Sequence, residues 1–460
     1  MPPLLANFVY RLQDRILQRP TFAYLASLEA SQWLDRADIE RLQAVKLTHL
    51  LRIAAAHCPW HAERIQAADI PIHEPHDVTL EELRKLPIMT KADIRRHGDR
   101  MIWQDVPGGL YAYNTGGSTG SPLSFYFGRL RQASDAAGRM RARRWWGVNV
   151  GDRELFLWGA PVELNKTDRI KRLRDRLINQ VLLNAFEMSP AQMTAYAKVI
   201  NDFKPACIYG YASSLTLLCA HVKARGIKLR LPQLKVVCTT GEPLFPHQRA
   251  LLEEVFGVPV ANEFGSRDGG LIAHESPTGQ QLLLSESVIL EVVNDADEPV
   301  PPGTVGEAVL TGLCSEAQPF IRYRTGDMVR LSNQACQEGR GLHVLDEIIG
   351  RTTDFVVRRD GTIMHALSVI YVLREFKSIN EFKFIQHSTA FCEILVVATP
   401  HWSADDEQKL LQKMAARLGD EVEVTVRLVE RIEPEASGKY RYVVSHVAIP
   451  DTLNITREVN

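Results

Sequence analysis

The stretch CIYGYASSLTLLCAHVKARGIKLRLPQLKVVCTT, residues 207–240, decides the fold class of the chain. Residues 207–209 and 236–238 are short apolar runs typical of buried strands, and residues 214–225 have the length and apolar spacing of a helix. Parallel strands need a long crossover connection, which is usually a helix. The stretch therefore predicts an α/β architecture with parallel strands.

The same alternation continues on both sides of this stretch. Residues 155–158 (LFLW) predict a further strand, and residues 191–203 and 246–256 predict helices. Residues 282–331 differ, because strand-like runs are separated there by Pro and Gly turns. This pattern predicts a small antiparallel or barrel-like subdomain, with strands at 288–293, 305–310 and 328–331.

The two ends of the chain have patterns of their own. Residues 1 to about 100 predict mainly helices, and Thr79 with Glu82 predicts a capping box at the start of one of them. From about residue 354 the chain predicts an α+β unit. Its expected strands are 355–357, 394–398 and 422–428, and its expected helices are 367–376 and 405–418.

The composition is that of an ordinary globular protein. The chain has 460 residues, of which 45% are hydrophobic and 24% charged, so we expect a sizeable buried core. The formal net charge of −1 gives no overall field that would attract nucleic acid, and we expect no nucleic-acid partner. A local basic run, Arg139, Arg141, Arg143 and Arg144, predicts a solvated helix face.

The cysteines and the apolar segments indicate the cellular compartment of the protein. The seven cysteines are scattered singly without a CxxC pair, which favours a reducing compartment over a disulfide framework. The first residues are apolar only briefly before Arg11 and Asp14, which is unlike a signal peptide. We find no apolar stretch long enough to span a bilayer. We therefore expect a cytoplasmic protein, and a peripheral membrane role stays open.

The strongest local signal is YNTGGSTGSP, residues 113–122. Its three glycines permit positive φ and close backbone approach. Successive backbone N–H groups in such a loop form a concavity that binds anions, and the hydroxyls of Thr115, Ser118 and Thr119 add donors. It is not a Walker A loop, because it has no Gly-Lys pair at the required spacing. Composition alone would favour an ordinary flexible loop over a binding loop.

Four further motifs follow in order along the chain: NEFGSRD at 262–268, YRTGD at 323–327, GRTTD at 350–354 and ASGK at 436–439. The first places an aromatic ring, which can stack on a nucleobase, close to a carboxylate. A carboxylate near phosphates would hold Mg²⁺.

Together these motifs resemble those of the adenylate-forming superfamily, which contains acyl-CoA synthetases, luciferases and nonribosomal adenylation domains. The chain is most similar to the phenylacetate–CoA ligase-like branch, which includes proteins named for capsular polysaccharide biosynthesis. The resemblance runs from LPIMTK at 86–91 to Lys439. It implies a large α/β domain, residues 1–350, with sheet layers flanked by helices and a small barrel-like subdomain. It also implies a hinge at 351–354 and a small mobile α+β C-terminal domain at 355–460.

The resemblance implies a role for each motif. The ATP phosphate-binding loop would comprise Thr115, Gly116, Gly117, Ser118, Thr119 and Gly120, and the segment against adenine would comprise Gly241, Glu242 and Pro243. Phe264 would stack on the base, Asp327 would accept bonds from the ribose hydroxyls, and Arg351 would lie near ribose and phosphate. The catalytic residues would be Lys439, Thr119 and Asp268, with Asp268 also binding Mg²⁺. The acyl pocket would be lined by Trp158, Tyr209, Tyr211, Ser213 and Gly265, and Phe156 is a further candidate. For any one of these side chains, a role in the core is at least as strong an alternative.

The implied reaction is activation of a carboxylic acid by ATP as an acyl-AMP, with release of pyrophosphate and transfer of the acyl group to coenzyme A. Cationic and backbone donors would offset the charge that builds when a carboxylate attacks a phosphate. An amine or a carrier protein is an alternative acceptor. A non-catalytic nucleotide-binding protein of surface polysaccharide assembly is an alternative of another class, and a glycosyl or phosphoryl transferase is a third.

Three departures from the family pattern are visible. Thr353 stands where relatives often have a charged hinge residue, with Asp354 next to it. Asp268 is one methylene shorter than the usual Glu. The zinc ligands of some relatives have only irregularly spaced counterparts, for which we expect a role without metal: His274, Cys314, Cys336 and His343.

Overall fold

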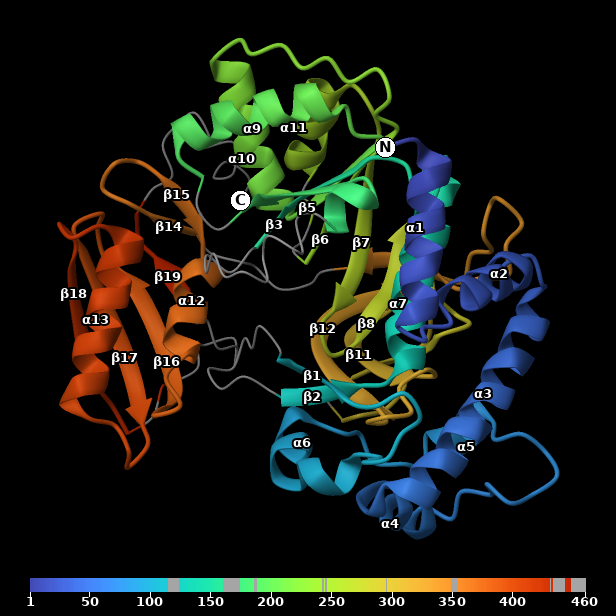
Figure 1. Cartoon of the computed structure of the whole chain (residues 1–460). Coiled ribbons are helices and arrows are strands. Elements are labelled where there is room, and N and C mark those ends of the chain that lie inside the picture. Colours follow the sequence, from blue (N-terminus) through green and yellow to red (C-terminus); the bar gives the residue numbers. More distant parts are fainter. Residues whose placement is uncertain are drawn as a thin grey trace.

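The computed structural model describes residues 1–114, 124–159, 174–185, 188–241, 244, 246–294, 296–348, 355–430, 432 and 443–447 (Figure 1). Among the helices in these ranges, none is both long and apolar enough to cross a membrane.

The large part of the molecule is built on one sheet, in which eleven strands of the described chain are hydrogen-bonded in the order β10-β11-β12-β13-β9-β8-β7-β6-β5-β3-β4. The half from β4 to β7 is parallel, as residues 207–240 predict. Its strands are β3 (Glu154–Trp158), β4 (Gln180–Asn184), β5 (Cys207–Gly210), β6 (Val236–Thr240) and β7 (Val260–Ser266).

The other half of this sheet is antiparallel and begins where β7 pairs with β8. Its strands are β8 (Gly270–Glu275), β9 (Gln281–Leu283), β10 (Val288–Val293), β11 (Val305–Gly312), β12 (Tyr323–Leu331) and β13 (Val344–Ile348). The antiparallel strands expected within 282–331 are therefore confirmed. The small subdomain that they were expected to form is continuous with the parallel strands through β7, β8 and β9.

Helices cover both faces of the parallel half (Figure 1). On one face lie α9 (Pro190–Phe203), α10 (Ala212–Ala224) and α11 (Pro246–Phe256), packed around Leu155, Ile208 and Val237. On the other face lies α7 (Arg129–Trp145), with α1 (Pro3–Ile16) and α2 (Thr21–Ser31) outside it. Alternate residues of one strand thus enter different cores, because successive side chains of a strand point to opposite faces.

The N-terminal region is mainly helical, as predicted. It continues through α3 (Arg36–His57), α4 (Pro59–Ala67), α5 (Leu80–Leu83), α6 (Lys91–His97) and the 3₁₀ helix η1 (Gly98–Met101). Thr79 and Glu82 form the predicted capping box. Leu47, Leu51 and Leu83 pack with Ile289 and Ile321, which docks these helices on the antiparallel half. A hairpin, β1 (Tyr111–Asn114) with β2 (Ser124–Phe127), leads into α7.

The C-terminal region has a sheet and a core of its own. A small hairpin, β14 (Phe355–Val357) with β15 (Ile363–His365), precedes a four-stranded sheet of order β18-β17-β16-β19. The remaining elements are α12 (Leu367–Arg374), β16 (Ile379–Gln386), β17 (Phe391–Ala398), α13 (Ala404–Leu418), β18 (Glu423–Leu428) and β19 (Val443–Ser445). Phe382, Phe384, Leu410 and Met414 are among its buried side chains.

The prediction of a solvated arginine face on α7 is wrong. Arg141 is completely buried and pairs with the buried Glu286 at 2.5 Å. Arg143 is also buried and pairs with Glu154, while Arg144 pairs with Glu29. Each partner lies in another element, so the run of arginines ties α7 to its surroundings instead of facing water.

Candidate active site

The parallel strands end level with one another. Leu157 is paired with Gly210, Gly210 with Thr239, and Thr240 with Glu263. In open α/β sheets, ligands bind in the crevice outside the carboxyl ends of such strands. The candidate residues Tyr211 and Ser213 follow β5, Gly241 follows β6, and Asp268 follows β7. The sheet therefore brings these residues to one edge.

Aromatic side chains lie at this edge. Trp158, the last residue of β3, stacks on Tyr211 with ring centroids 4.2 Å apart and planes 18° apart. The ring of Tyr209 lies 5.7 Å from that of Trp158. Tyr211 is the N-cap residue of α10, and Ser213 is buried in the first turn of that helix. The structure therefore brings together four of the five residues predicted for the acyl pocket.

Gly241 adjoins this aromatic stack. Its φ is +77°, which favours glycine, and a Cβ there would lie 3.3 Å from the ring of Tyr211. The backbone of Gly241 therefore lies closely against the ring of Tyr211, and contact of this segment with adenine stays a prediction. Glu242 and Pro243 lie outside the described residues.

Sequence reasoning assigned no role to Glu263, which lies buried beneath this edge. Its Oε1 accepts hydrogen bonds from the hydroxyls of Tyr209 at 2.7 Å and Thr240 at 3.2 Å, and from Nε of Arg139 at 3.4 Å. Burial alone would raise the pKa of Glu263, but the positive charge of Arg139 and the other partners outweigh it and lower the pKa. The carboxylate is therefore ionised, and its bonds fix the direction of the Tyr209 hydroxyl.

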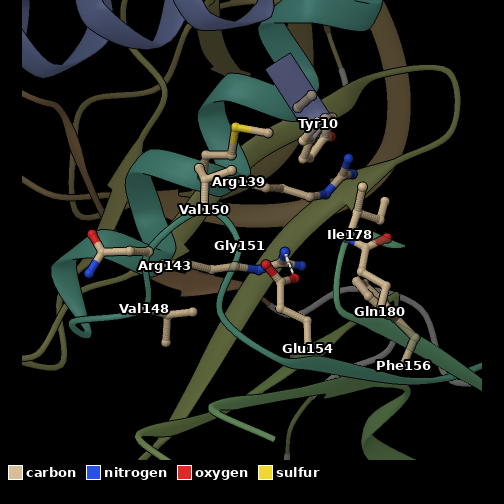
Figure 2. A pocket seen from close by; sticks show the side chains of 13 residues that line it. Tyr10, Arg139, Arg143, Val148, Val150, Gly151, Glu154, Phe156, Ile178 and Gln180 are labelled. Atoms are coloured by element: carbon tan, nitrogen blue, oxygen red, sulfur yellow. Dashed lines mark hydrogen bonds and ion pairs between the residues drawn. The ribbon is translucent and has the colours of Figure 1, made fainter. Parts of the chain in front are cut away.

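A pocket of about 180 Å³ lies on the α7 side of β3 and β4 (Figure 2). Arg139 and Arg143 reach into it from α7, Tyr10 borders it from α1, and Phe156 and Glu154 border it from β3. Of the candidates for the acyl pocket, Phe156 lines this pocket. The other predicted residues, Trp158, Tyr209, Tyr211, Ser213 and Gly265, are not among those that line it. Arg143 lies over the rings of both Phe156 and Tyr209. This pocket therefore adjoins the aromatic side chains at the edge of the sheet.

The Gly-rich segment connects β1 to β2 in the sequence. The residues predicted to bind phosphate, Thr115, Gly116, Gly117, Ser118, Thr119 and Gly120, lie outside the described residues. The stem is described: Asn114 pairs with Ser124, and the carbonyl oxygen of Asn114 accepts a hydrogen bond from Arg267 at 3.1 Å. The loop therefore starts beside the residue that precedes Asp268.

Asp268 is buried in the turn between β7 and β8, and its carboxylate is held from two sides. Tyr323 donates to Oδ2 at 2.6 Å, and the backbone N–H of Gly269 donates to Oδ1 at 3.2 Å. Burial alone would raise the pKa of Asp268, but the positive charge of Lys91 and hydrogen bonds from Tyr323 and Ser266 lower it. Lys91 belongs to LPIMTK at 86–91, where the family resemblance begins. No role was assigned to this lysine from the sequence.

Phe264 and Gly265 occupy a bulge between β7 and β8. The ring of Phe264 is buried among apolar side chains that include Leu271 and Leu283. A Cβ at Gly265 would lie 2.5 Å from the carbonyl oxygen of Gly270, so only glycine fits there without a shift of the backbone. Stacking of Phe264 on a base stays a prediction.

Asp327 lies in an irregular part of β12. Glu307 pairs with Met328 but Val309 pairs with Arg324, so extra residues of β12 bulge out between these pairs. Gly326 has a φ of +81°, and the hydroxyl of Thr325 accepts a bond from the backbone N–H of Asp327 at 3.1 Å. Such bulges commonly re-aim a side chain next to an active site.

Arg267 also connects the two parts of the molecule. Its second guanidinium nitrogen donates to the hydroxyl of Tyr371 on α12 at 2.7 Å. The ring of Tyr371 packs against the core around α10 and α11. The predicted hinge, with Arg351, Thr353 and Asp354, lies outside the described residues, as does Lys439, which is predicted to be catalytic.

The four candidate zinc ligands have separate surroundings in the structure. Cys314 bonds to the Tyr24 hydroxyl at 3.0 Å, and Cys336 packs among apolar side chains. His343 bonds to the Ser285 hydroxyl at 2.9 Å, and His274 to the carbonyl oxygen of Glu275 at 2.9 Å. Over the described ranges, no group of three potential metal-binding residues occurs.

Comparison of sequences gives two kinds of relatives. Residues 356–446 match the family described as the CapK C-terminal domain. Protein CapK of Staphylococcus aureus is 21% identical over 452 residues, which cover 97% of this chain and 98% of that protein. The phenylacetate–coenzyme A ligase of Thermus thermophilus is 26% identical over 353 residues, which cover 71% of this chain and 73% of that protein.

Comparison of structures agrees in fold. A crystal structure of 2-hydroxyisobutyryl-CoA ligase, in complex with 2-HIB-AMP and CoA, is similar with a TM-score of 0.61 and 19% identity. The match covers 90% of this chain and 91% of that one. The five motifs, the fold and these relatives agree: the chain is similar to AMP-forming ligases of the adenylate-forming superfamily, and within it to the phenylacetate–CoA ligase-like branch.

Proposed function

We propose that this ligase uses ATP to convert a carboxylic acid into an acyl-AMP, with release of pyrophosphate, and then transfers the acyl group to coenzyme A. The observation that carries the proposal is a continuous set of contacts between three motifs. Asn114 at the base of the Gly-rich loop contacts Arg267, and its neighbour Asp268 bonds to Tyr323 of the strand that bears Asp327. These contacts support the proposal that the Gly-rich segment would bind phosphate at the same edge where Asp268 would meet the metal ion and Asp327 the ribose.

Asp268 fits a role in binding Mg²⁺. Mg²⁺ is usually held by one or two carboxylates together with phosphate oxygens and water, so a full set of protein ligands is not needed. The lowered pKa of Asp268 keeps its carboxylate ionised at neutral pH. When bound, the ion would neutralise phosphate oxygens. Tyr323 and Lys91 would hold Asp268 in place rather than touch the nucleotide.

The remaining roles rest on the family resemblance and the local geometry. Gly241, with Glu242 and Pro243, would lie against adenine, and Phe264 would contact the base. Asp327 would accept hydrogen bonds from the ribose hydroxyls, for which the bulge in β12 supplies a suitable backbone. Arg351 and Lys439 would add positive charge near the α-phosphate, where the transition state gathers negative charge.

The acyl group would lie against the aromatic edge formed by Trp158, Tyr209 and Tyr211. Flat stacked rings favour a compact aromatic or similar acid. Gly265 would border the same space through its backbone, since the backbone of Gly270 fills the position of its missing Cβ. Ser213 would border the same space from the first turn of α10.

The C-terminal unit would rotate about residues 351–354 between the two half-reactions. One small domain cannot present two faces to the same site at once, and hinge rotation is a common solution. Solved structures of 2-hydroxyisobutyryl-CoA ligase in complex with 2-HIB-AMP and CoA support coenzyme A as the acceptor, and an amine or a carrier protein is the alternative. We also propose a cytoplasmic location, since all seven cysteines are free and buried.

The test is to incubate the protein with ATP, Mg²⁺ and a panel of acids, with and without coenzyme A, and to identify products by mass spectrometry. We expect AMP and an acyl-AMP from at least one acid, and its thioester when coenzyme A is added. Binding of ATP with no AMP formed from any acid would favour the non-catalytic alternative. An amide or an acylated carrier in place of the thioester would change the acceptor only.

A further inference from the structure

The outer face of α1 carries a continuous strip of apolar side chains. Leu4, Phe8 and Ile16 are 87%, 62% and 70% exposed, and Leu5 and Leu12 are exposed beside them. Positions 4, 8, 12 and 16 are each four residues apart, so they follow one side of the helix. An isolated exposed apolar side chain is ordinary, but a strip along a whole helix is typical of a surface that binds something.

This helix is firmly attached by its opposite side, so the exposed strip is not a sign of a detached segment. Ala6 and Asp14 are buried, and Asp14 accepts a bond from the Thr21 hydroxyl at 2.7 Å. The amide of Asn7 donates to the carbonyl oxygen of Val150 at 3.2 Å. A Cβ at Gly151 would lie 2.2 Å from the carbonyl oxygen of Pro3, which shows how closely α1 packs against that loop.

The exposed charges along this face are all positive. Arg11 and Arg15 are exposed at the edge of the strip, and the only acidic residue of α1, Asp14, is buried. Arg176 is exposed as well, three residues before Asn179, whose side chain bonds to the backbone of Met1. An apolar strip flanked by arginines combines the two attractions that hold a helix at an anionic membrane surface, because arginine can bury its stem and keep its charge among headgroups.

We propose that α1 docks this protein on an anionic lipid surface, with Leu4, Phe8, Leu12 and Ile16 entering the boundary between headgroups and acyl chains. Arg11 and Arg15 face the lipid phosphates. The helix lies in the plane of the surface, since its other side is fixed to the protein.

A second copy of the chain fits this face less well. Pairing α1 with α1 across a twofold axis would bring the same arginines together without an exposed acidic partner on either helix. Like charges placed opposite each other weaken an interface. An anionic surface offers the opposite charge to every exposed charged residue of α1.

The test uses the full chain and sedimentation with two kinds of vesicle, one of phosphatidylcholine alone and one with roughly one third phosphatidylserine. We expect binding to the anionic vesicles that falls as salt is raised. Phe8→Asp with Leu12→Asp should lower binding by about tenfold or more, since it removes apolar area from the strip. Arg11→Glu with Arg15→Glu should also lower binding by about tenfold or more and reduce its dependence on salt.

Matched controls change the same residue types elsewhere. Leu428→Asp replaces an exposed leucine of β18, and Arg225→Glu with Lys228→Glu reverses two exposed charges after α10. Both should bind vesicles like the parent, and ATP-dependent acyl-AMP formation should be unchanged in the α1 variants. Equal binding to both vesicles, or α1 variants that bind like the parent, would overturn the proposal. So would a parent dimer that Phe8→Asp with Leu12→Asp converts to monomers without any vesicle binding.

Discussion

Glu263 and Asp268 lie five positions apart in the chain but have different partners. Glu263 accepts bonds from Tyr209, Thr240 and Arg139, which are all fixed parts of the sheet and of α7. Asp268 lies in a turn, beside the base of the Gly-rich loop, and its charge is balanced by Lys91. Glu263 is thus suited to fixing the position of Tyr209. Asp268 is suited to the proposed role of binding a metal ion.

Asp268→Asn should destabilise the protein in a pH-dependent way. The folded-state pKa of Asp268 lies below its ordinary value of 3.8, so the ionised carboxylate stabilises the fold fully above that pH. This stabilisation is lost as the pH falls through the lowered pKa. Urea unfolding at several pH values should show a difference between parent and variant near pH 7 that shrinks below about pH 4. A constant difference would contradict the assigned charge.

Asp327→Ala should weaken ATP binding by about tenfold to a hundredfold. The ribose hydroxyls would lose their charged acceptor, and we expect a net cost of roughly 1.5–3 kcal/mol, the worth of one hydrogen bond to a charged group. Calorimetric titration with ATP measures the effect. Asp346→Ala, which removes an exposed carboxylate from the neighbouring strand β13, is the matched control and should leave affinity unchanged. Equal affinity in both variants would refute the assignment of Asp327.

At the scale of elements, α7 organises the large domain through its arginines. Arg139, Arg141 and Arg143 reach carboxylates that come from β7, from the β9–β10 connection and from β3. Close packing reinforces these ties, since a Cβ at Gly138 would lie 2.3 Å from the side chain of Leu284. The helix therefore links the parallel and the antiparallel halves of the sheet.

Glu286→Ala should cost about 3–5 kcal/mol of unfolding free energy, because it leaves the buried charge of Arg141 without its partner. Replacing both residues with apolar ones, as in Arg141→Met with Glu286→Leu, should cost less. Urea denaturation of the two variants measures this. Glu254→Ala, which breaks the exposed pair with Lys223, should change stability by less than about 1 kcal/mol. A double variant no more stable than Glu286→Ala would show that packing, not charge, dominates there.

The same elements show how far sequence reasoning reaches. Strands such as β5 and β6 and helices such as α9 and α11 were predictable, because their signal lies within each segment as apolar spacing and length. The burial of Arg141 was not, since its partner Glu286 is distant in the chain and nothing local distinguishes a paired arginine from a solvated one. The short strands β9 and β13 are likewise stable only through pairing with each other and their neighbours.

The residues of the candidate site likewise fall into those that a single segment of sequence indicates and those that depend on distant partners. Gly241, Gly265 and Asp268 were assigned roles from the family resemblance, because the motifs that carry it are visible within single segments; these roles stay predictions. Glu263 and Lys91 were not identified, since their importance arises only from the side chains that the fold brings to them. Tyr371 was missed for the same reason, as it lies on α12, far along the chain from Arg267.

At the scale of the whole molecule, the bond between Arg267 and Tyr371 joins the large domain to α12. If the C-terminal unit rotates, this contact exists in only one of its arrangements. Tyr371→Phe keeps the ring but removes the hydroxyl, so it should change one half-reaction by up to about tenfold and leave the other nearly unchanged. Single-turnover rates of acyl-AMP formation and of transfer from supplied acyl-AMP measure this. Equal changes in both rates would contradict a contact specific to one arrangement.

Acid-dependent exchange of labelled pyrophosphate into ATP tests the central claim most directly, because it reports reversible acyl-AMP formation without any acceptor. With an acid identified from the panel, the parent protein should catalyse exchange. Lys439→Ala should slow it greatly while calorimetry shows ATP affinity largely intact, since the lysine would act on the transition state and not on bound ATP. Exchange without added acid, no exchange with any acid that the protein consumes, or full exchange by Lys439→Ala would contradict the proposed mechanism.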